Sequence, residues 1–237
     1  MSDARVIKTC LRIIRYLRSF IFPQIVENRK SNVSGELEVI CKNGKYILDT
    51  ANVNYSFGGL HEVFQKTFNH AGIKQRKIKN TLILGFGAGS VASILQEEYG
   101  KDIEVVGVEK DEVVIELAQK YFSIEKCKNL CLHCTDAYDF VLTTLHLSFD
   151  LIVVDIFLDW IVPEKFQEEN YLIALSKCLS VNGILFYNFI IRDDKSRNQA
   201  GQLYKRLENC IGNTEWFKIS DRNAENWIFI CDKSKKP

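Results

Sequence analysis

The chain has 237 residues, of which 46% are hydrophobic and 26% charged, and its formal net charge is +1. This composition is ordinary for a globular α/β domain with an appendage and excludes a long low-complexity chain. The near-zero charge excludes a global attraction to nucleic acid, and no apolar run reaches the roughly 20 residues that a membrane span needs.

Basic residues recur at helical spacing near the N-terminus: Arg5, Lys8, Arg12 and Arg15. Apolar residues lie mostly elsewhere around the same helix: Val6, Ile13, Leu17 and Phe20. We interpret this segment as a helix packed on its own domain or on a partner subunit, with a solvated basic face. A membrane-surface helix and a targeting peptide are the alternatives. We do not expect a secretory signal here, because arginines interrupt the apolar segment.

The next stretch predicts a small β module. Residues 35–49, GELEVICKNGKYILD, alternate like a β-hairpin, and Asn43-Gly44 is a strong type I′ turn signal. Residues 60–68 then predict a short helix. We therefore expect residues 1–75 to form an N-terminal helix and a small β module, and residues 76–237 to form a second, larger domain.

The larger domain alternates strand and helix patterns. Strands are predicted at 81–84, 103–108, 130–134, 150–154 and 184–188. Helices are predicted at 91–98, after an Asp111 cap, and at 138–145, 163–179 and 195–211, the fourth ending at Asn182-Gly183. Two closely spaced strands, 216–220 and 227–231, leave too little chain for a helical crossover and predict an antiparallel hairpin. The pattern predicts a doubly wound, mostly parallel, seven-stranded α/β sheet of the Rossmann-like kind.

A glycine loop, Gly85-Phe86-Gly87-Ala88-Gly89, follows the first of these strands. Three acids end the next strands: Glu109, Asp136 and Asp155. Ligands of open parallel sheets bind at this edge, and an acid about 20 residues past the loop accepts hydrogen bonds from ribose hydroxyls. A dinucleotide loop would carry a third glycine where this chain has Ser90, so the pattern favours the nucleoside S-adenosylmethionine. A glycine turn that only packs helix on strand is the alternative.

Four motifs carry a family resemblance: ILGFGAG, VVGVEKDEVV, CTDAYDFV and FDLIVVDIFLDWIVPEKF. Together they resemble the spermidine-synthase-like branch of class I S-adenosylmethionine-dependent methyltransferases, over roughly residues 35–190. The resemblance implies that Glu109 binds ribose, that Asp136 with Ala137 binds adenine, and that Asp155 faces the reaction cleft. The expected cofactor contacts are Gly85, Phe86, Gly87, Ala88, Gly89, Glu109, Lys110, Asp136, Ala137 and Asp155.

Departures from the family pattern bear on the reaction. Aminopropyltransferases that resemble this chain carry Asp in the glycine loop, which suits decarboxylated S-adenosylmethionine, and Ala88 takes that place here. Their DSSDP-like run reads DIFLDWIVP, and acids upstream are replaced by Ser56 and Phe57. A polycation needs carboxylates when it is buried. We therefore expect a methyltransferase whose apolar acceptor pocket lies near Phe57, Ile156, Phe157 and Trp160.

Asp155 is the candidate proton acceptor, and Tyr55 and His61 are weaker candidates. A helix cap or a contact with the cofactor's amino group would equally explain Asp155, and a satisfied helix histidine would explain His61. An aminopropyltransferase with a divergent pocket and a noncatalytic nucleoside-binding protein remain as alternatives. We expect a small-molecule acceptor, no nucleic-acid partner and no metal. A homodimer through the N-terminal segment is compatible with all three hypotheses.

The eight cysteines predict no disulfide framework. Cys41, Cys178 and Cys231 lie in apolar patterns where a free thiol acts as a small hydrophobe, so reduced thiols and a cytoplasmic location are expected. CKNLCLHC, residues 127–134, has the cysteine spacing of a radical S-adenosylmethionine cluster. Because strand alternation would place Cys131 and Cys134 on opposite faces, we expect no cluster there.

Overall fold

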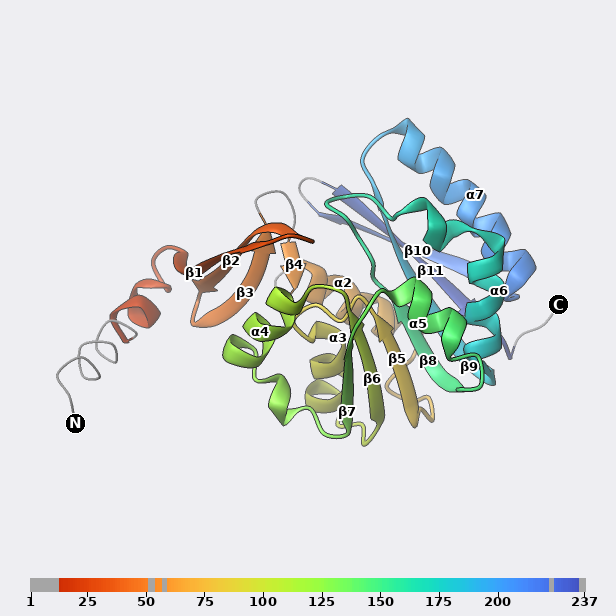
Figure 1. Ribbon diagram of the computed structural model, residues 1–237, viewed down its shortest axis with the longest axis horizontal. Helices are drawn as coiled ribbons and strands as arrows, with labels where there is room; N and C mark the ends of the chain where they lie inside the picture. Colours follow the sequence, from red (N-terminus) through yellow and green to blue (C-terminus); the bar gives the residue numbers. More distant parts are fainter. Residues whose placement is uncertain (1–12, 51–53, 57–58, 222–223, 235–237) are drawn as a thin grey trace.

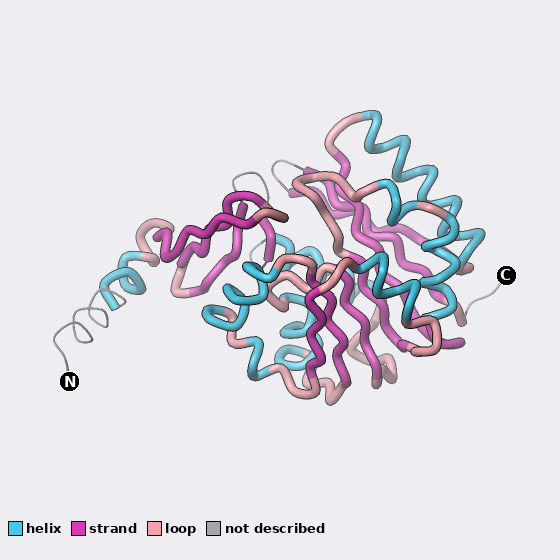
Figure 2. The backbone as a smooth tube through the Cα atoms, in the orientation of Figure 1, coloured by secondary structure: helices cyan, strands magenta, loops and turns pink. Residues whose placement is uncertain are grey.

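The computed structural model describes residues 13–50, 54–56, 59–221 and 224–234. Within these residues, the strands form a four-stranded antiparallel sheet near the N-terminus and a seven-stranded mixed sheet (Figures 1 and 2). Helices cover both faces of the larger sheet (Figure 1). The predicted α/β fold with a doubly wound, mostly parallel sheet is confirmed.

The small sheet has the order β1-β2-β3-β4. Its strands are β1 (Gln24–Ser31), β2 (Gly35–Lys42), β3 (Lys45–Thr50) and β4 (Asn54–Ser56). The predicted hairpin is confirmed as β2–β3, and its turn residues Asn43 and Gly44 have φ of 52° and 72°. The sequence did not predict β1, because QIVENRKS is mostly polar and shows no clear alternation of period two.

The large sheet has the order β10-β11-β9-β8-β5-β6-β7. Its strands are β5 (Asn80–Leu84), β6 (Glu104–Glu109), β7 (Leu130–Cys134), β8 (Phe149–Val154), β9 (Leu179–Ile191), β10 (Thr214–Asp221) and β11 (Ala224–Asp232). The strands from β5 to β9 pair in parallel, and the β10–β11 hairpin pairs antiparallel to β9, as predicted. The strand order reverses direction at β5, where the glycine loop begins.

The helices form two layers, one on each face of this sheet. One layer contains α2 (Gly59–His70), α3 (Ser90–Ser93) and α4 (Glu112–Tyr121), and the other contains α5 (Ala137–Thr143), α6 (Glu169–Cys178) and α7 (Asp194–Cys210). Side chains of the central strands alternate between the two cores. Ile83 and Val153 join the first core, whereas Leu82 and Val154 join the second.

The structure differs from the predicted helices at three points. The helix predicted at 91–98 is α3 followed by a π-helical turn, η1 (Ile94–Glu98). The helix predicted at 163–179 is a 3₁₀ turn, η3 (Glu164–Gln167), followed by α6, because Glu168 between them is extended. A further 3₁₀ turn, η2 (Ile124–Lys126), follows α4.

The third difference is the end of the helix before β9, which was predicted at Asn182-Gly183. The helix ends at Cys178 and both residues lie inside β9. A Cβ on Gly183 would lie 2.7 Å from Leu179 Cδ1, so the glycine permits tight packing within an irregular strand and does not end a helix.

The predicted boundary at residue 75 stays a prediction. Leu37 and Val39 of the small sheet share one buried apolar cluster with Phe64 of α2 and Phe186 of β9. The small sheet is therefore packed against the same core as the large one. Among the described helices, none is long and apolar enough to cross a bilayer.

Candidate active site

The glycine loop begins directly after β5. Gly85 has φ of +82°, and its N–H donates to the carbonyl of Val108 at 2.9 Å. A Cβ at Gly85 would lie 2.1 Å from the carbonyl oxygen of Asp155. Only glycine fits here, because the backbone is left-handed and touches the end of β8. The loop thereby brings the ends of β5, β6 and β8 together.

Glu109 ends β6 and is buried beside this loop. Its Oε2 accepts from the N–H of Gly87 at 2.9 Å, and its Oε1 accepts from the N–H groups of Lys110 and Asp111 at 2.9 and 3.0 Å. Burial raises the pKa of Glu109 even though these bonds oppose the rise. A carboxylate has about four acceptor positions, so one is left, which fits one ribose hydroxyl better than the two expected from the sequence.

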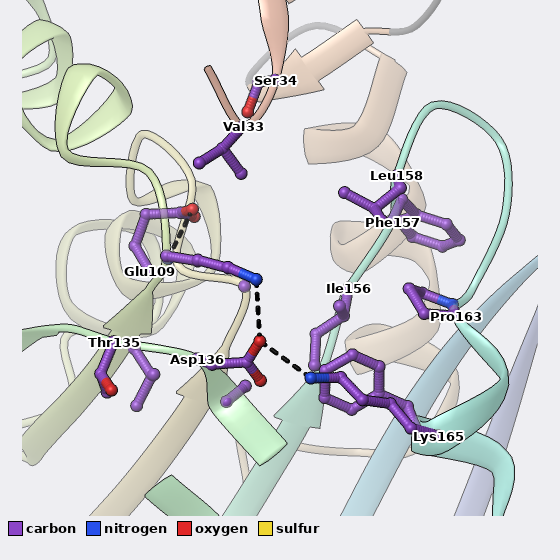
Figure 3. Close-up of a pocket in the computed structure, with 15 residues that line it drawn as sticks. Val33, Ser34, Glu109, Thr135, Asp136, Ile156, Phe157, Leu158, Pro163 and Lys165 are labelled. Atoms are coloured by element: carbon purple, nitrogen blue, oxygen red, sulfur yellow. Dashed lines mark hydrogen bonds and ion pairs between the residues drawn. The ribbon is translucent and has the colours of Figure 1, made fainter. Parts of the chain in front are cut away.

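Asp136 follows β7 and caps α5. Its Oδ1 accepts from the N–H of Tyr138 at 2.9 Å, and its Oδ2 accepts from Lys110 Nζ at 3.0 Å and Lys165 Nζ at 2.9 Å (Figure 3). Burial raises the pKa of Asp136, but the lysine hydrogen bonds outweigh it and hold the pKa below its ordinary value. By the same count of about four acceptor positions, one is left on this carboxylate, at Oδ1.

The sequence did not identify Lys165 as a site residue. The sequence pattern predicted that this residue lies in a helix. Its approach to Asp136 depends on the 3₁₀ turn η3, which no local sequence pattern predicts. Lys110 was predicted beside Glu109, and the structure brings it to Asp136. The two lysines together compensate the charge of one carboxylate in the site.

Two adjoining cavities lie at this edge of the sheet. We name the two cavities after the ligands expected from the sequence. The first, the nucleoside cavity, is lined by Gly85, Val108, Glu109, Lys110, Thr135, Asp136, Ala137, Ile156, Pro163, Lys165 and Phe166. The second, the acceptor cavity, has a volume of about 400 Å³ and is lined by Ser31, Asn32, Gly35, Thr50, Leu60, Asp155, Asp159 and Ile190. Val33, Ser34, Phe157 and Leu158 line both, so the cavities form one cleft.

The roof of the cleft is the turn between β1 and β2, which carries Val33 and Ser34 (Figure 3). The hydroxyl of Ser31 donates to Asp111 Oδ2 at 2.5 Å, and Asp111 Oδ1 accepts from the N–H of Val113 as the predicted cap of α4. The small sheet is thus fixed over the cleft through a helix cap. The sequence did not predict this contact, because it joins residues 80 positions apart.

Asp155 follows β8 and contributes to the acceptor cavity. Its Oδ1 accepts from Asn188 Nδ2 at 2.9 Å. Burial raises the pKa of Asp155 to about 7, with a smaller contribution from the charge of Glu109 and an opposing one from Asn188. A carboxyl group with this pKa exchanges protons near neutral pH, which suits a general base. Asn188 is fully buried and was predicted only as the end of a strand.

Six predicted residues lie away from the described lining of the cleft: Phe86, Gly87, Ala88, Gly89, His61 and Trp160. Ala88 is fully buried in the apolar cluster with Phe86. His61 lies 2.6 Å from Glu98 and lines a separate groove against η1. Trp160 packs against the guanidinium of Arg192, 4.7 Å from the ring centre.

The remaining predicted residues divide between described and undescribed positions. Ile156 and Phe157 line the cleft as predicted, and Ala137 lines the nucleoside cavity. Phe57 lies outside the described residues, and of Tyr55 only the backbone is described, in β4. In the part of the chain that is described, no cluster of three His, Cys, Asp or Glu side chains is arranged to hold a metal.

Comparison with known proteins yields one family and several similar transferases. The model of the spermine/spermidine synthase domain matches residues 61–196, more than half of the chain. A polyamine aminopropyltransferase of Vibrio vulnificus (strain CMCP6) is 32% identical over 114 residues, which cover 47% of this chain and 38% of the relative. The chain thus spans well under half of the length of the curated polyamine transferases that it matches.

Two solved structures share the fold. A spermidine synthase in complex with the transition-state analogue AdoDATO has a TM-score of 0.63 at 16% identity, covering 89% of this chain and 74% of its own. Human methyltransferase-like protein 13 in complex with SAH has a TM-score of 0.60 at 17% identity, covering 74% of this chain and 82% of its own. Aminopropyl transfer and methyl transfer thus both occur among the names of similar proteins.

Proposed function

Because the chain belongs to the spermine/spermidine synthase domain family, we propose that it is a transferase that uses S-adenosyl-L-methionine to methylate a small-molecule acceptor. The nucleoside cavity supplies the features that such a cofactor needs. The side-chain-free backbone at Gly85 and the remaining acceptor position of Glu109 support nucleoside binding. When bound, the cofactor supplies an electrophilic methyl group on a sulfonium.

The observation that carries the proposal is the scarcity of carboxylates in the acceptor cavity. Of the described residues lining the cleft, Glu109 and Asp136 already accept hydrogen bonds from protein groups. Asp159 is exposed at a turn, which leaves Asp155 as the partly buried acid. One such carboxylate compensates a single cationic group, whereas a polyamine brings several.

The protein's own contribution is positioning and proton transfer. Ile156, Phe157 and Leu158 form an apolar wall where the two cavities meet, which orients an acceptor against the cofactor and limits water. Asp155 takes the proton that the acceptor atom loses, and Asn188 fixes the carboxylate through its Nδ2 hydrogen bond.

Aminopropyl transfer is the second candidate. It is favoured by the family itself and by the similarity to a polyamine aminopropyltransferase. Asp155 would then serve the same role toward an amine acceptor. The two reactions differ in the cofactor, because aminopropyl transfer uses the decarboxylated form.

The first test is calorimetric titration of the unaltered protein with S-adenosylmethionine and, separately, with its decarboxylated form. Preference for the intact cofactor supports methyl transfer. Preference for the decarboxylated form overturns the proposal in favour of aminopropyl transfer. Absence of binding by either assigns the glycine loop a purely structural role. Because Ala88 is buried in the apolar core, Ala88→Asp would perturb folding, so the comparison is made without that variant.

The second test is Asp155→Asn, assayed for methyl transfer across amine, carboxylate and phenol acceptors. We expect the rate to fall about 100-fold or more while cofactor affinity changes little. Asp102→Asn is the matched control, since this exposed residue precedes β6 and lies outside the lining of both cavities. Equal rates for Asp155→Asn and the unaltered protein would refute the base. Cofactor binding without turnover of any acceptor would support a noncatalytic protein.

A further inference from the structure

Large apolar side chains gather on the surface at the start of the described chain. Half of all exposed large hydrophobic residues in the described ranges fall between residues 13 and 25: Ile13, Ile14, Tyr16, Leu17, Phe20, Ile21, Phe22 and Ile25. We call this surface the N-terminal apolar face. Leu17 is 61% exposed and Ile21 is 79% exposed. A contiguous apolar surface of this kind marks an interaction site.

The segment is fixed to the β2–β3 turn through its one buried residue. Ser19 is 1% exposed, and its hydroxyl accepts from the N–H of Gly44 at 2.9 Å and donates to the carbonyl of Tyr16 at 2.6 Å. A Cβ on Gly44 would lie 2.9 Å from the ring of Phe20. The attachment uses the hairpin tip, which the ring of Tyr16 also approaches, and the apolar side chains of the segment stay largely exposed. The interpretation of this segment as a helix packed on its own domain or on a partner subunit stays a prediction.

Figure 1 places this segment at the outer end of the small sheet, on the side away from the large sheet. Residues 13–18 are helical. At 100° per residue, Ile13, Ile14 and Leu17 share one side of the helix, and Arg15 and Arg18 share the other. The apolar and basic residues are therefore separated around the helix.

The charges around the face have one sign. Arg15 and Arg18 are exposed, and so are Lys42 and Lys45, which flank the turn that holds the segment. The sequence has no Asp or Glu between residues 4 and 26, and Arg5, Lys8 and Arg12 add further positive charge beyond the described residues. Glu27, the next acid, already binds Lys120 and Tyr121.

We propose that the N-terminal apolar face docks on an anionic lipid bilayer and lies in its interface. The apolar side chains enter the boundary between headgroups and acyl chains, while the arginines and lysines meet lipid phosphates and carboxylates. A second copy of the chain would instead bring two sets of like charges together, which is unfavourable. Charge complementarity therefore selects the lipid surface over self-association.

The test is flotation of the full chain with vesicles of phosphatidylcholine alone and of phosphatidylcholine mixed with phosphatidylserine. We expect binding to the anionic vesicles, weak binding to the neutral ones, and release at about 1 M salt, where the Debye length is about 3 Å. Arg15→Glu combined with Arg18→Glu should weaken binding about thirtyfold or more, since each basic residue near the surface contributes about 1 kcal/mol.

A matched pair of variants isolates the apolar contribution. Ile21→Glu should weaken vesicle binding about tenfold or more. Val181→Glu, at a residue that is 77% exposed on β9, should leave it unchanged. No binding to anionic vesicles, or equal binding by Ile21→Glu and Val181→Glu, overturns the proposal. So does a dimer in vesicle-free solution that Ile21→Glu dissociates, measured by light scattering after gel filtration, because a second copy would then cover the face.

Discussion

The two halves of the cleft differ in how their polar groups are satisfied. In the nucleoside cavity, Glu109 accepts three backbone hydrogen bonds and Asp136 binds two lysines. In the acceptor cavity, Asp155 accepts a hydrogen bond from the Asn188 amide. Within the described structure, Asn188 Oδ1 has no hydrogen-bond partner. The carboxylates of the first half are held by fixed hydrogen-bond partners, whereas the second half keeps unused hydrogen-bond acceptor positions. This difference is compatible with the proposed function, in which the first half holds the nucleoside and the second half the acceptor.

Gly85→Ala is the change with the largest expected effect, because it damages both halves at once. The new Cβ would meet the Asp155 carbonyl at 2.1 Å and would require a left-handed alanine at φ +82°. We expect a loss of about 3 kcal/mol or more in the free energy of unfolding, and loss of cofactor binding. Urea unfolding and calorimetry measure the two effects.

Gly201→Ala is the control for this change. Gly201 lies inside α7 and has open space around a Cβ, so alanine should be neutral or stabilise by about 0.5–1 kcal/mol. If Gly85→Ala unfolds at the same urea concentration as the unaltered protein, the close contact between the loop and β8 is wrong.

The pH dependence of stability should come largely from the acceptor cavity. Folding raises the pKa of Asp155 from 3.8 to about 7, so the folded state binds a proton that the unfolded chain releases. The resulting stability is fully present below about pH 4 and is lost as pH rises through about 7. We expect unfolding free energy to fall by roughly 2–4 kcal/mol between about pH 4 and pH 8, in urea titrations.

Two variants separate the contributions of the two cavities to this pH dependence of the unfolding free energy. Asp155→Asn should remove most of it, while Asp102→Asn should keep it. Burial also raises the pKa of Glu109, so this residue too contributes a loss of stability as the pH rises. A slope that survives intact in Asp155→Asn would mean that another carboxyl group with a raised pKa, Glu109 or Asp49, is the titrating group.

Ser31→Ala should have a smaller effect than Gly85→Ala or the titration of Asp155, because it removes one hydrogen bond. The change loosens the turn that forms the roof of both cavities. The Ser31 hydroxyl bond to Asp111 holds the β1–β2 turn, which carries Val33 and Ser34. We expect a loss of about 1–2 kcal/mol in unfolding free energy and a severalfold weaker cofactor affinity. Ser220→Ala, on exposed β10, is the control. Unchanged affinity would show that the roof does not contact the ligand.

Local signals predicted the large sheet and one half of the cleft. Buried strands such as β8 read as continuous apolar runs, and β7 was predicted at Leu130–Cys134, the range that the structure shows. The glycine loop, Glu109 and Asp136 follow strand ends, so their meeting at one edge follows from parallel topology. The backbone hydrogen bonds of Glu109 were not foreseen, because they depend on the shape of the loop.

Features that depend on distant contacts were not predictable from local pattern. Lys165 reaches Asp136 because Glu168 interrupts a helix. Ser31, at the end of β1, reaches Asp111, the cap of α4. Ala88 was expected to face the cofactor, yet packing places it in the core. In each case the spatial neighbour, and not the residue's own sequence context, determines its role.

The hydrogen bond between Ser31 and Asp111 also determines when the small sheet can be completed during protein synthesis. The small sheet leaves the ribosome first, but three contacts that hold it come from α4: Ser31–Asp111, Arg29–Glu116 and Glu27–Lys120. The first partner is made 80 residues later, which at about 5–20 residues per second is a delay of roughly 4–16 seconds. Until then Leu37 and Val39 lack the rest of their core. The nascent chain therefore exposes the apolar side chains of this hairpin until the segments that cover them have been synthesised.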